Sequence, residues 1–595
     1  MWCARSTGES GTWPPARAAS PTGGLPLPLE FTVSCSGGYS EAYPPRQVHC
    51  GETEGFWYRD VTHFGDSPLY PLNAYFTVAM MDLAQSYFYT RYFAMPTSGG
   101  RATLLVMGRV FRTSYPPRGA DIAEFGRRLR AYLERWDERY EEWKTEVLRI
   151  VDEMRRVSTD LPQGLEDIGV VEKGEGFSPY AVLEGWMRLY TLWLRLWFKH
   201  YEFLMVGYLL YHLFHKFLKT FFPNIPEHHI IDMLRPDEMD IWRPHLILKR
   251  LADRARELGV EQLVLSAGSA QELEERLAQA GKAGARWLAE WGAAKYPWFY
   301  ISTAAGFHHW EERWINNLDI PLTHLKRYIR EGTRQSRRRL SPDELAARYA
   351  ELLPEEVRRS FWDYLHHARK AFRYIEEHSF YVEHLGFTVG YGKVRDYGRL
   401  LKKLGMLDDA EDIYLLRWDE VFHGLLDGLT AWANGTEPRL RLRGVARSRR
   451  LLLEELRKAE PPPRLGTPPE EIRDSNLVML HRAQTGAQPD GALAGVPASP
   501  GRARGVAVVV RDAEDLKRVG PGAVAVVKAL YPSWLSALAA AAGIVAEAGG
   551  ILSHTAIVAR ELGKPAVVAV EGATEKIREG ATVVVDGYEG LVYVR

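Results

Sequence analysis

Two Pro/Gly-rich stretches near the C-terminal end divide this chain into two unlike parts. Residues 460–469 read EPPPRLGTPP, and residues 485–500 read TGAQPDGALAGVPASP. Such composition is typical of linkers and domain edges. Before these stretches apolar residues recur at helical spacing, and after them come short β-rich runs separated by glycine turns. The chain is therefore predicted to fold as two bodies with few contacts across the linker, so that the smaller can move as a unit.

The boundaries follow from this division. Residues 1–45 are rich in Ser, Gly, Pro and Ala and lack the apolar core of a signal peptide. We expect them to be a disordered extension, or the product of a start codon assigned too far upstream. Residues 46–460 predict one large, mostly α-helical unit, residues 461–495 a linker, and residues 496–595 a compact domain of mixed β and α structure.

Periodicity supports the helical assignment of the large unit. Apolar residues from 121 to 154 recur every three or four positions, which predicts a single long helix packed inside a helical domain rather than a dimerising coiled coil. The most apolar stretch, residues 186–222, is interrupted by charges. Its longest uncharged run, residues 203–215, is shorter than the ~20 residues that a membrane span needs. We therefore expect no membrane association.

Charge and cysteine content exclude other classes. The 595 residues carry 76 Lys and Arg against 76 Asp and Glu, so the net charge of zero argues against capture of nucleic acid by the whole chain. The three cysteines, Cys3, Cys35 and Cys50, all lie near the N-terminus. The rest of the fold therefore owes nothing to disulfides or thiolate metal sites, which suits a reducing cytoplasm. We expect a cytoplasmic protein without a metal site of its own.

The segment with the strongest chemical signal is residues 544–568, IVAEAGGILSHTAIVARELGKPAVV. A predicted strand leads into Gly549 and Gly550, which allow a sharp turn and close approach of a ligand. Ser553 occupies an N-cap position, and a helix is predicted to start at His554. The histidine therefore lies in the first helical turn, beside a glycine pair and a hydroxyl group.

This arrangement predicts a phosphate site that contains a nucleophile. The free N–H groups and positive end of a helix N-terminus favour phosphate oxygens. The same positive end disfavours imidazolium, which keeps His554 neutral and nucleophilic. The hydroxyl groups of Ser553 and Thr555 can donate to phosphoryl oxygens.

The C-terminal domain resembles a known family. Residues 496–595 are similar to the swivelling phosphohistidine domain of phosphoenolpyruvate synthase, pyruvate phosphate dikinase and rifampicin phosphotransferase, through GVPASPGRARGVAVVV, AAAAGIVAEAGGILSHTAIVARELGKPAVV and GATVVVDGYEGLVYV. In that family the histidine of a Thr/Ser/Cys-His pair takes a phosphoryl group, which here implies His554. Residues 528–534 (KALYPSW) fall where the family has a Thr-x-Pro-x-Trp-like segment. Tyr531 replaces the usual polar residue, so we expect no catalytic role there.

The helical unit has a resemblance of its own. DVTHFGDSPLYPL (residues 60–72), YPWFYISTAAGFHHWEERWINNLDIPLTHL (296–325) and VRDYGRLLKKLGMLDDAEDIYLL (394–416) are similar to the central domain of rifampicin phosphotransferase. They are more similar still to the large subunit of phenylphosphate synthase, which takes its ATP chemistry from a separate subunit. The implied fold is multidomain, with a large, mostly α-helical substrate-binding domain followed by a small β/β/α swivelling domain.

The resemblance implies a phosphotransferase (kinase) subunit. A separate ATP-grasp protein would phosphorylate His554, which would pass the group to a hydroxyl acceptor, a phenol or other aromatic alcohol. We find no glycine-rich phosphate loop in residues 45–460 and expect no barrel after residue 595, so ATP with its Mg or Mn is expected on the partner and no cofactor is expected to bind stably here. Candidates for the acceptor site are His63, His378, Glu383 and Arg395, with His378 and Glu383 favoured as the general base.

Two alternatives stay open. The acceptor can instead be an antibiotic of the rifampicin kind, although detoxifying enzymes of this type carry their own ATP domain. The chain can also be a non-catalytic phosphohistidine sensor or scaffold. A deep aromatic pocket facing His554 would favour the transferase, and a closed surface would favour the scaffold. The sequence leaves open the acceptor, the phosphate that is carried, the partner and the oligomeric state.

Overall fold

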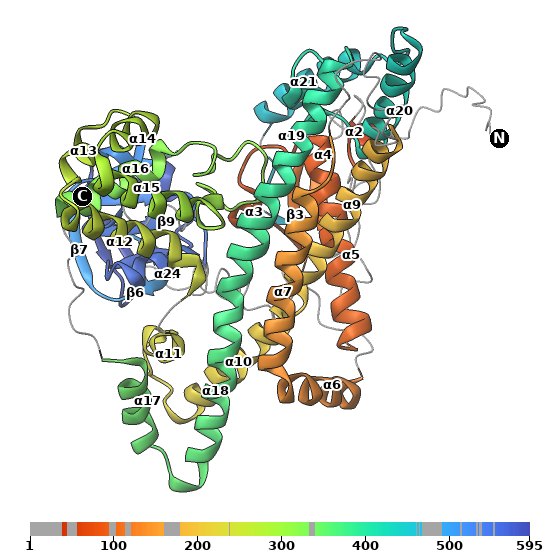
Figure 1. The fold of residues 1–595 in the computed structure, drawn as a ribbon. Coiled ribbons are helices and arrows are strands. Elements are labelled where there is room, and N and C mark those ends of the chain that lie inside the picture. Colours follow the sequence, from red (N-terminus) through yellow and green to blue (C-terminus); the bar gives the residue numbers. More distant parts are fainter. Residues whose placement is uncertain are drawn as a thin grey trace.

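The structure is a computed structural model of the whole chain. It describes residues 39–44, 56–94, 103–113, 121–159, 179–236, 239–331, 340–459, 461–462, 464–466, 491–511, 515–530, 534, 538–550 and 554–595. Figure 1 shows a part built from long helices, with the small C-terminal domain (blue) docked beside it. The predicted fold class is confirmed: a mostly helical region precedes a small β-rich domain.

Long helices form the main layer of the helical unit. They are α7 (Trp136–Arg155), α9 (Pro179–Tyr201), α10 (Leu204–Phe221), α18 (Glu355–His378) and α19 (Phe387–Lys403). The short helix α5 (Met80–Ser86) joins them, because π-helical turns over Tyr75–Ala79 and Tyr87–Tyr92 extend it on both sides. Helix α18 runs through the middle of the molecule, and α10 packs along it (Figure 1). Four tryptophans, Trp143, Trp186, Trp193 and Trp197, are fully buried between these helices. Among the described residues, no helix combines the length and apolarity that crossing a bilayer requires.

A second group of helices has its own apolar core. It comprises α12 (Arg243–Glu257), α13 (Glu261–Ser266), α14 (Ala270–Ala278), α15 (Gly281–Lys295) and α16 (Asp319–Glu331). Trp287, Trp291 and Trp314 lie at the centre of this core. Most of the tryptophans of the helical unit therefore fill cores. Other helices of the unit include α11 (Glu227–Leu234), α17 (Pro342–Glu351), α20 (Trp418–Asn434) and α21 (Leu442–Lys458).

The long helix predicted over residues 121–154 is interrupted. Helix α6 (Ile122–Glu134) ends at Arg135, whose backbone (φ −113°, ψ 23°) leaves the helical region, and α7 starts afresh at Trp136. Figure 1 shows α6 lying across the end of α7. The break lets Tyr132 and Trp136 both enter the core, where they are 2% and 3% exposed. No proline or glycine marks the break, so the apolar periodicity of the sequence continues across it and predicts one helix where the structure has two.

A small antiparallel sheet corrects two predicted boundaries. Its strands are β1 (Trp57–Arg59), β2 (Thr103–Val106), β3 (Arg109–Arg112) and β4 (Arg464–Leu465), in the order β2-β3-β1-β4. Strand β4 pairs with β1, so the first residues of the predicted 461–495 linker belong to the helical unit. The predicted 1–45 extension is also too long, since α2 (Tyr39–Ala42) is helical, and Ala42 and Tyr43 are buried.

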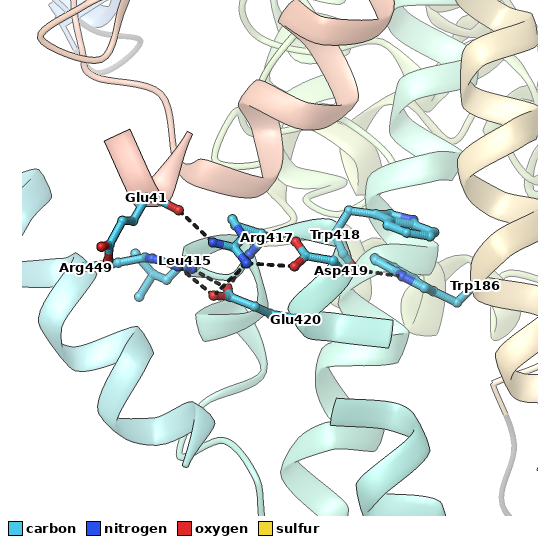
Figure 2. Close-up of polar contacts among 8 residues, drawn as sticks. All are labelled: Glu41, Trp186, Leu415, Arg417, Trp418, Asp419, Glu420 and Arg449. Carbon is cyan, nitrogen blue, oxygen red and sulfur yellow. Dashed lines mark hydrogen bonds and ion pairs between the residues drawn. The ribbon is translucent and has the colours of Figure 1, made fainter. Parts of the chain in front are cut away.

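Hydrogen bonds and ion pairs join α2, α20 and α21 (Figure 2). Arg417, at the start of α20, donates to the Asp419 carboxylate at 2.7 and 2.9 Å and to the Glu41 carbonyl at 3.0 Å. Arg449 of α21 donates to Glu420 at 2.7 Å and to the Leu415 carbonyl at 3.0 Å. These contacts tie α20 and α21 to the first described helix of the chain.

The small domain is built on an eight-stranded sheet in the order β5-β12-β11-β7-β8-β9-β10-β6. Its strands are β5 (Ala492–Ala494), β6 (Val496–Ser499), β7 (Arg502–Val510), β8 (Ala523–Val527), β9 (Gly543–Ala546), β10 (Ala566–Val568), β11 (Thr582–Asp586) and β12 (Leu591–Val594). Strands β7 to β10 are parallel, and α24 (His554–Glu561) connects β9 to β10. Because β5 pairs with β12, the domain begins before the predicted residue 496.

Candidate functional site

The turn before α24 lies at the carboxyl end of the parallel strands. The N–H of Glu547 donates to the Val527 carbonyl at 3.0 Å, and the N–H of Ala548 donates to the Lys528 carbonyl at 2.8 Å. Gly549 follows with φ 119°, a backbone conformation that favours glycine. The edge where parallel strands end is where open α/β sheets bind ligands.

Helix α24 begins at His554, at the predicted position. The structure describes His554 and Thr555 as backbone positions of this first turn, and Ser553 lies outside the described residues. Gly550 adjoins the turn and is half-buried. The strand, glycine turn and helix start of the predicted phosphate site therefore follow one another at a single edge of the sheet.

This edge is docked on the helical unit. Lys528, whose carbonyl holds the turn, forms an ion pair with Asp66. Trp534 Nε1 donates to the Thr303 carbonyl at 2.8 Å. On another side of the domain, the ring of Tyr588 lies 6.3 Å from the ring of His228 in α11. The turn that leads to His554 therefore faces the segments around residues 60–66 and 302–309.

An Asp–His pair lies just before the docking residue Asp66. Asp60 caps α3 (Val61–Phe64) by accepting from the His63 backbone N–H at 3.2 Å, and the His63 Nδ1 lies 2.8 and 2.9 Å from the two Asp60 oxygens. Arg112 of β3 lies 3.5 Å from the second Asp60 oxygen. The Asp60 side chain is 4% exposed, whereas that of His63 is 39% exposed.

The pair shifts both of its pKa values. Burial alone would raise the pKa of Asp60, but the charges of His63 and Arg112 and the hydrogen bonds outweigh it and lower that pKa to about 2. Burial alone would lower the pKa of His63, but the Asp60 carboxylate outweighs it and raises that pKa. An ionised, buried Asp60 therefore orients a partly exposed imidazole through its Nδ1.

Next to this pair is a buried cluster of His200 (α9), His378 (end of α18) and Glu383. Glu383 lies in η6 (Ser379–Gly386), a π-helix that directly continues α18. Glu383 Oε1 lies 3.3 Å from His200 Nδ1 and 3.5 Å from His378 Nε2, and Ser379 Oγ donates to Glu383 Oε2 at 2.6 Å. The wider π-helical turn places residues five apart on one face, and such turns are frequent at functional sites.

Electrostatic and steric contacts connect the cluster to the docked edge. The charge of Glu383 adds to the rise in the pKa of His63. A Cβ at Gly306, in the segment that Trp534 contacts, would lie 2.6 Å from the Glu383 carbonyl oxygen. Burial raises the pKa of Glu376, in the last turns of α18, to about 8, while the charge of Arg560 in α24 opposes the rise. The Asp60–His63 pair (hereafter the dyad) and the cluster of His200, His378 and Glu383 therefore lie close to the docked edge of the small domain.

The predicted acceptor-site residues separate into two groups. His63, His378 and Glu383 meet in this region. Arg395 does not, since it pairs with Glu411 in the wall of a cavity of about 670 Å³ that Tyr70, His309 and Trp310 also line. Ring contacts place Phe64, Phe307 and His308 between the two regions. The expectation that Arg395 shares a site with His378 and Glu383 is wrong.

Sequence reasoning missed several residues of this region. Asp60 has a local signal, because Asp three residues before His63 is the pattern of an N-cap. His200 is a polar residue within the most apolar stretch of the chain, a weaker sign of a buried polar site. Lys528 and Trp534 belong to the segment that was expected to have no catalytic role. Their docking contacts are to residues distant in the sequence, so no local pattern marks them.

Comparisons with known proteins agree with the C-terminal assignment. Residues 519–590 match the family described as PEP-utilising enzyme, mobile domain. The chain is 29% identical over 294 residues to the uncharacterized phosphotransferase YvkC of Bacillus subtilis, covering 48% of this chain and 34% of that protein. It is 32% identical over 197 residues to rifampicin phosphotransferase of Streptomyces sviceus, covering 33% and 20%, and 48% identical over 100 residues to phosphoenolpyruvate synthase of Aeropyrum pernix, covering 17% and 12%. The chain thus spans about a third or less of these relatives.

Proposed function

We propose that the chain is a phosphotransferase subunit that carries the mobile phosphohistidine domain of PEP-utilising enzymes. His554 receives a phosphoryl group from a separate ATP-grasp protein and delivers it to a hydroxyl acceptor in the helical unit, a phenol or another aromatic alcohol. One observation carries the proposal: the edge of the sheet that bears the start of α24 docks where the Asp60–His63 dyad lies.

The dyad supports a role for His63 as the general base. Asp60 holds the proton on Nδ1, which leaves Nε2 to accept a proton, as in hydrolase triads. The acceptor oxygen attacks phosphorus, the P–N bond to His554 breaks as the P–O bond forms, and the hydroxyl proton passes to His63 Nε2. The His554 ring leaves as neutral imidazole when its other nitrogen carries a proton.

Aromatic surroundings support an aromatic acceptor. The ring of Phe307 meets the His63 ring edge-on at 5.8 Å, and Phe64 lies 5.3 Å from Phe307. Such edges and faces favour aromatic ligands through burial and offset packing. The cavity of about 670 Å³ beyond His308 is lined by Tyr70 and Trp310 and offers room for a larger acceptor. The separate phosphoryl donor is proposed because residues 45–460 hold no glycine-rich phosphate loop.

The test is a phosphorylation assay in two stages. The purified chain is incubated with β- or γ-labelled ATP, with and without a candidate ATP-grasp protein, and acid-labile, base-stable label is scored on the protein. Phenol is then added and labelled product is measured. We expect label only with the partner, loss of all label in His554→Ala, and transfer to phenol.

The control is His215→Gln, which alters a His–Glu pair between α10 and α11, in which His215 Nε2 lies 2.9 Å from Glu227. This variant should become labelled on His554 and should transfer the label to phenol, as the parent does. Label without a partner would place the nucleotide site in this chain, and label that no hydroxyl compound removes would favour the sensor or scaffold. Full activity of His554→Ala would overturn the proposal.

A further inference from the structure

We propose that His200, His378 and Glu383 form a binding site for a divalent transition metal ion inside the helical unit. The three side chains are 6%, 5% and 4% exposed. They come from two packed helices, His200 from α9, and His378 and Glu383 from the continuous helix formed by α18 and η6. One ligand atom from each lies within 4.8 Å of the others. The proposal departs from the sequence-based expectation that this chain holds no metal, and it does not depend on the phosphotransferase proposal.

The distances fit ligands around a common centre better than hydrogen bonds. Zn–N and Zn–O bonds are about 2.0–2.2 Å, which places two tetrahedral ligands roughly 3.4 Å apart. The observed separations from Glu383 Oε1 are 3.3 Å to His200 Nδ1 and 3.5 Å to His378 Nε2. Charge-assisted N–H···O bonds are shorter, about 2.7–2.9 Å. The His200 and His378 ligand atoms lie within 4.8 Å of one another.

The burial of the cluster also supports a metal site. His200 Nδ1 has no hydrogen-bond partner among the described residues, although it faces the carboxylate. A carboxylate and two imidazoles withdrawn from water are costly unless a charge or a full set of hydrogen bonds compensates. A divalent cation would satisfy all three inward-facing atoms at once.

The surrounding residues hold the ligands in place, as the outer shell of a metal site does. Ser379 Oγ donates to Glu383 Oε2 at 2.6 Å, which leaves Oε1 turned toward the two histidines. Tyr374 stacks on the His378 ring (5.6 Å, 17°), and Trp197 and Tyr201 meet the His200 ring at 5.1 and 4.7 Å. Both imidazoles are therefore restricted in rotation.

The donor set identifies the class of ion. Two imidazoles and one carboxylate suit Zn²⁺, Fe²⁺ or Mn²⁺, whereas Mg²⁺ and Ca²⁺ prefer oxygen ligands alone. Three protein ligands leave at least one position for water or a hydroxyl compound, as in catalytic rather than structural zinc sites. The partly exposed His63 lies beside the cluster.

The experiment measures metal uptake directly. The full chain is stripped with a chelator, dialysed and titrated with Co²⁺ alone, whose visible absorption reports binding, and Zn²⁺ is then added as a competitor. We expect one equivalent of Co²⁺, displaced by Zn²⁺, and a metal-dependent rise in melting temperature. Glu383→Gln should weaken binding more than roughly 100-fold, and Ser379→Ala roughly 10–100-fold.

His215→Gln is the matched control, because it removes a histidine from another His–Glu pair and should bind Co²⁺ like the parent. Circular dichroism checks that each variant is folded, and Ser379→Ala serves if Glu383→Gln does not fold. No equimolar uptake by the folded parent, or equal uptake by parent, Glu383→Gln and Ser379→Ala, would overturn the site. Label on His554 is scored in a separate assay, so failure of either proposal leaves the other standing.

Discussion

At the scale of single residues, His63 is the side chain on which the proposed transfer step depends most. Its Nδ1 is committed to Asp60, and its side chain is the exposed member of the pair. The first test is His63→Gln, which removes the base. A general base contributes about 10²–10⁴-fold, so transfer from phosphorylated His554 to the acceptor should fall by that factor. Loading of His554 should be unchanged, and single-turnover assays of the two stages check both points.

Asp60→Asn provides the companion variant. It keeps the shape of the residue but loses the charge that orients the imidazole, so it too should slow transfer and leave loading intact. Transfer at the parent rate in His63→Gln would mean that the base lies elsewhere.

The second prediction concerns stability in acid. Burial lowers the pKa of His308 to about 3, so this ring stays neutral in the folded protein. In the unfolded chain its pKa is about 6.5. Below that pH, His308 binds a proton in the unfolded state but stays unprotonated in the folded state. The free energy of unfolding should therefore fall between about pH 6.5 and pH 3, by at most ~1.4 kcal/mol per pH unit for this residue.

Urea unfolding between pH 7 and pH 4 measures the slope. His308→Gln should flatten it, and so should His324→Gln, because burial also lowers the pKa of His324 to about 3. Slopes identical to the parent in both variants would contradict this account.

Residues of the candidate site differ in how far the sequence reveals them. The position of His554 at a helix start depends on neighbouring residues only, and the structure begins α24 there. His200 and Glu383 meet only because α9 packs against η6, which no local pattern records. Arg395 follows Glu383 closely in the sequence, but α19 carries it to the cavity beside Glu411.

At the scale of elements, the start of α20 is fixed by charge. Glu420 accepts from Arg449, whose side chain is largely buried (Figure 2). The third prediction is that Glu420→Ala lowers the free energy of unfolding by about 2–4 kcal/mol, because it leaves a buried guanidinium without its carboxylate. Replacing both residues by Met should recover most of that loss. Urea unfolding measures all three proteins.

The control is Glu138→Gln, which removes an exposed pair of similar geometry, Arg135 to Glu138 at 2.8 Å, and should leave stability unchanged. If Glu420→Ala behaves like this control, the ion pairs at the end of α20 do not stabilise the fold.

Periodicity predicts elements well where they are regular and alone. Strands β8, β9 and β12 are examples, since each is a short apolar run between turns, as the composition after the linker predicts. The sheet β2-β3-β1-β4 was missed because its strands are very short and come from distant segments. The π-helix η6 was missed as well. Its residues are buried on all sides, so they lack the alternation of apolar and polar faces from which periodicity predicts a helix.

At the scale of the whole molecule, the composition change at the linker predicts two bodies, and the structure contains them. It does not predict how they meet, since docking rests on Lys528, Trp534 and their partners Asp66 and Thr303. The fourth prediction tests this contact. Lys528→Glu should slow transfer to the acceptor roughly 2–5-fold, a modest effect because an exposed ion pair contributes little.

Combining Lys528→Glu with Asp66→Lys should restore the transfer rate by restoring the attraction. Loading of His554 by the partner should be equal in all of these proteins, since it uses the undocked domain. The measurement is the decay of labelled protein after acceptor is added. A double variant as slow as the single one would argue against the observed docking.

The pairing of β4 with β1 has a kinetic consequence. It anchors the chain at Leu465 on the helical unit, and the small domain resumes at Gly491. The intervening chain, even fully extended, spans at most about 94 Å. In the proposed transfer, an acceptor bound to the helical unit would meet the phosphoryl carrier at an effective concentration set by this tether, of the millimolar order for short linkers, and not by the amount of protein. Delivery should be first-order and insensitive to dilution, whereas loading by a separate protein should slow as both are diluted.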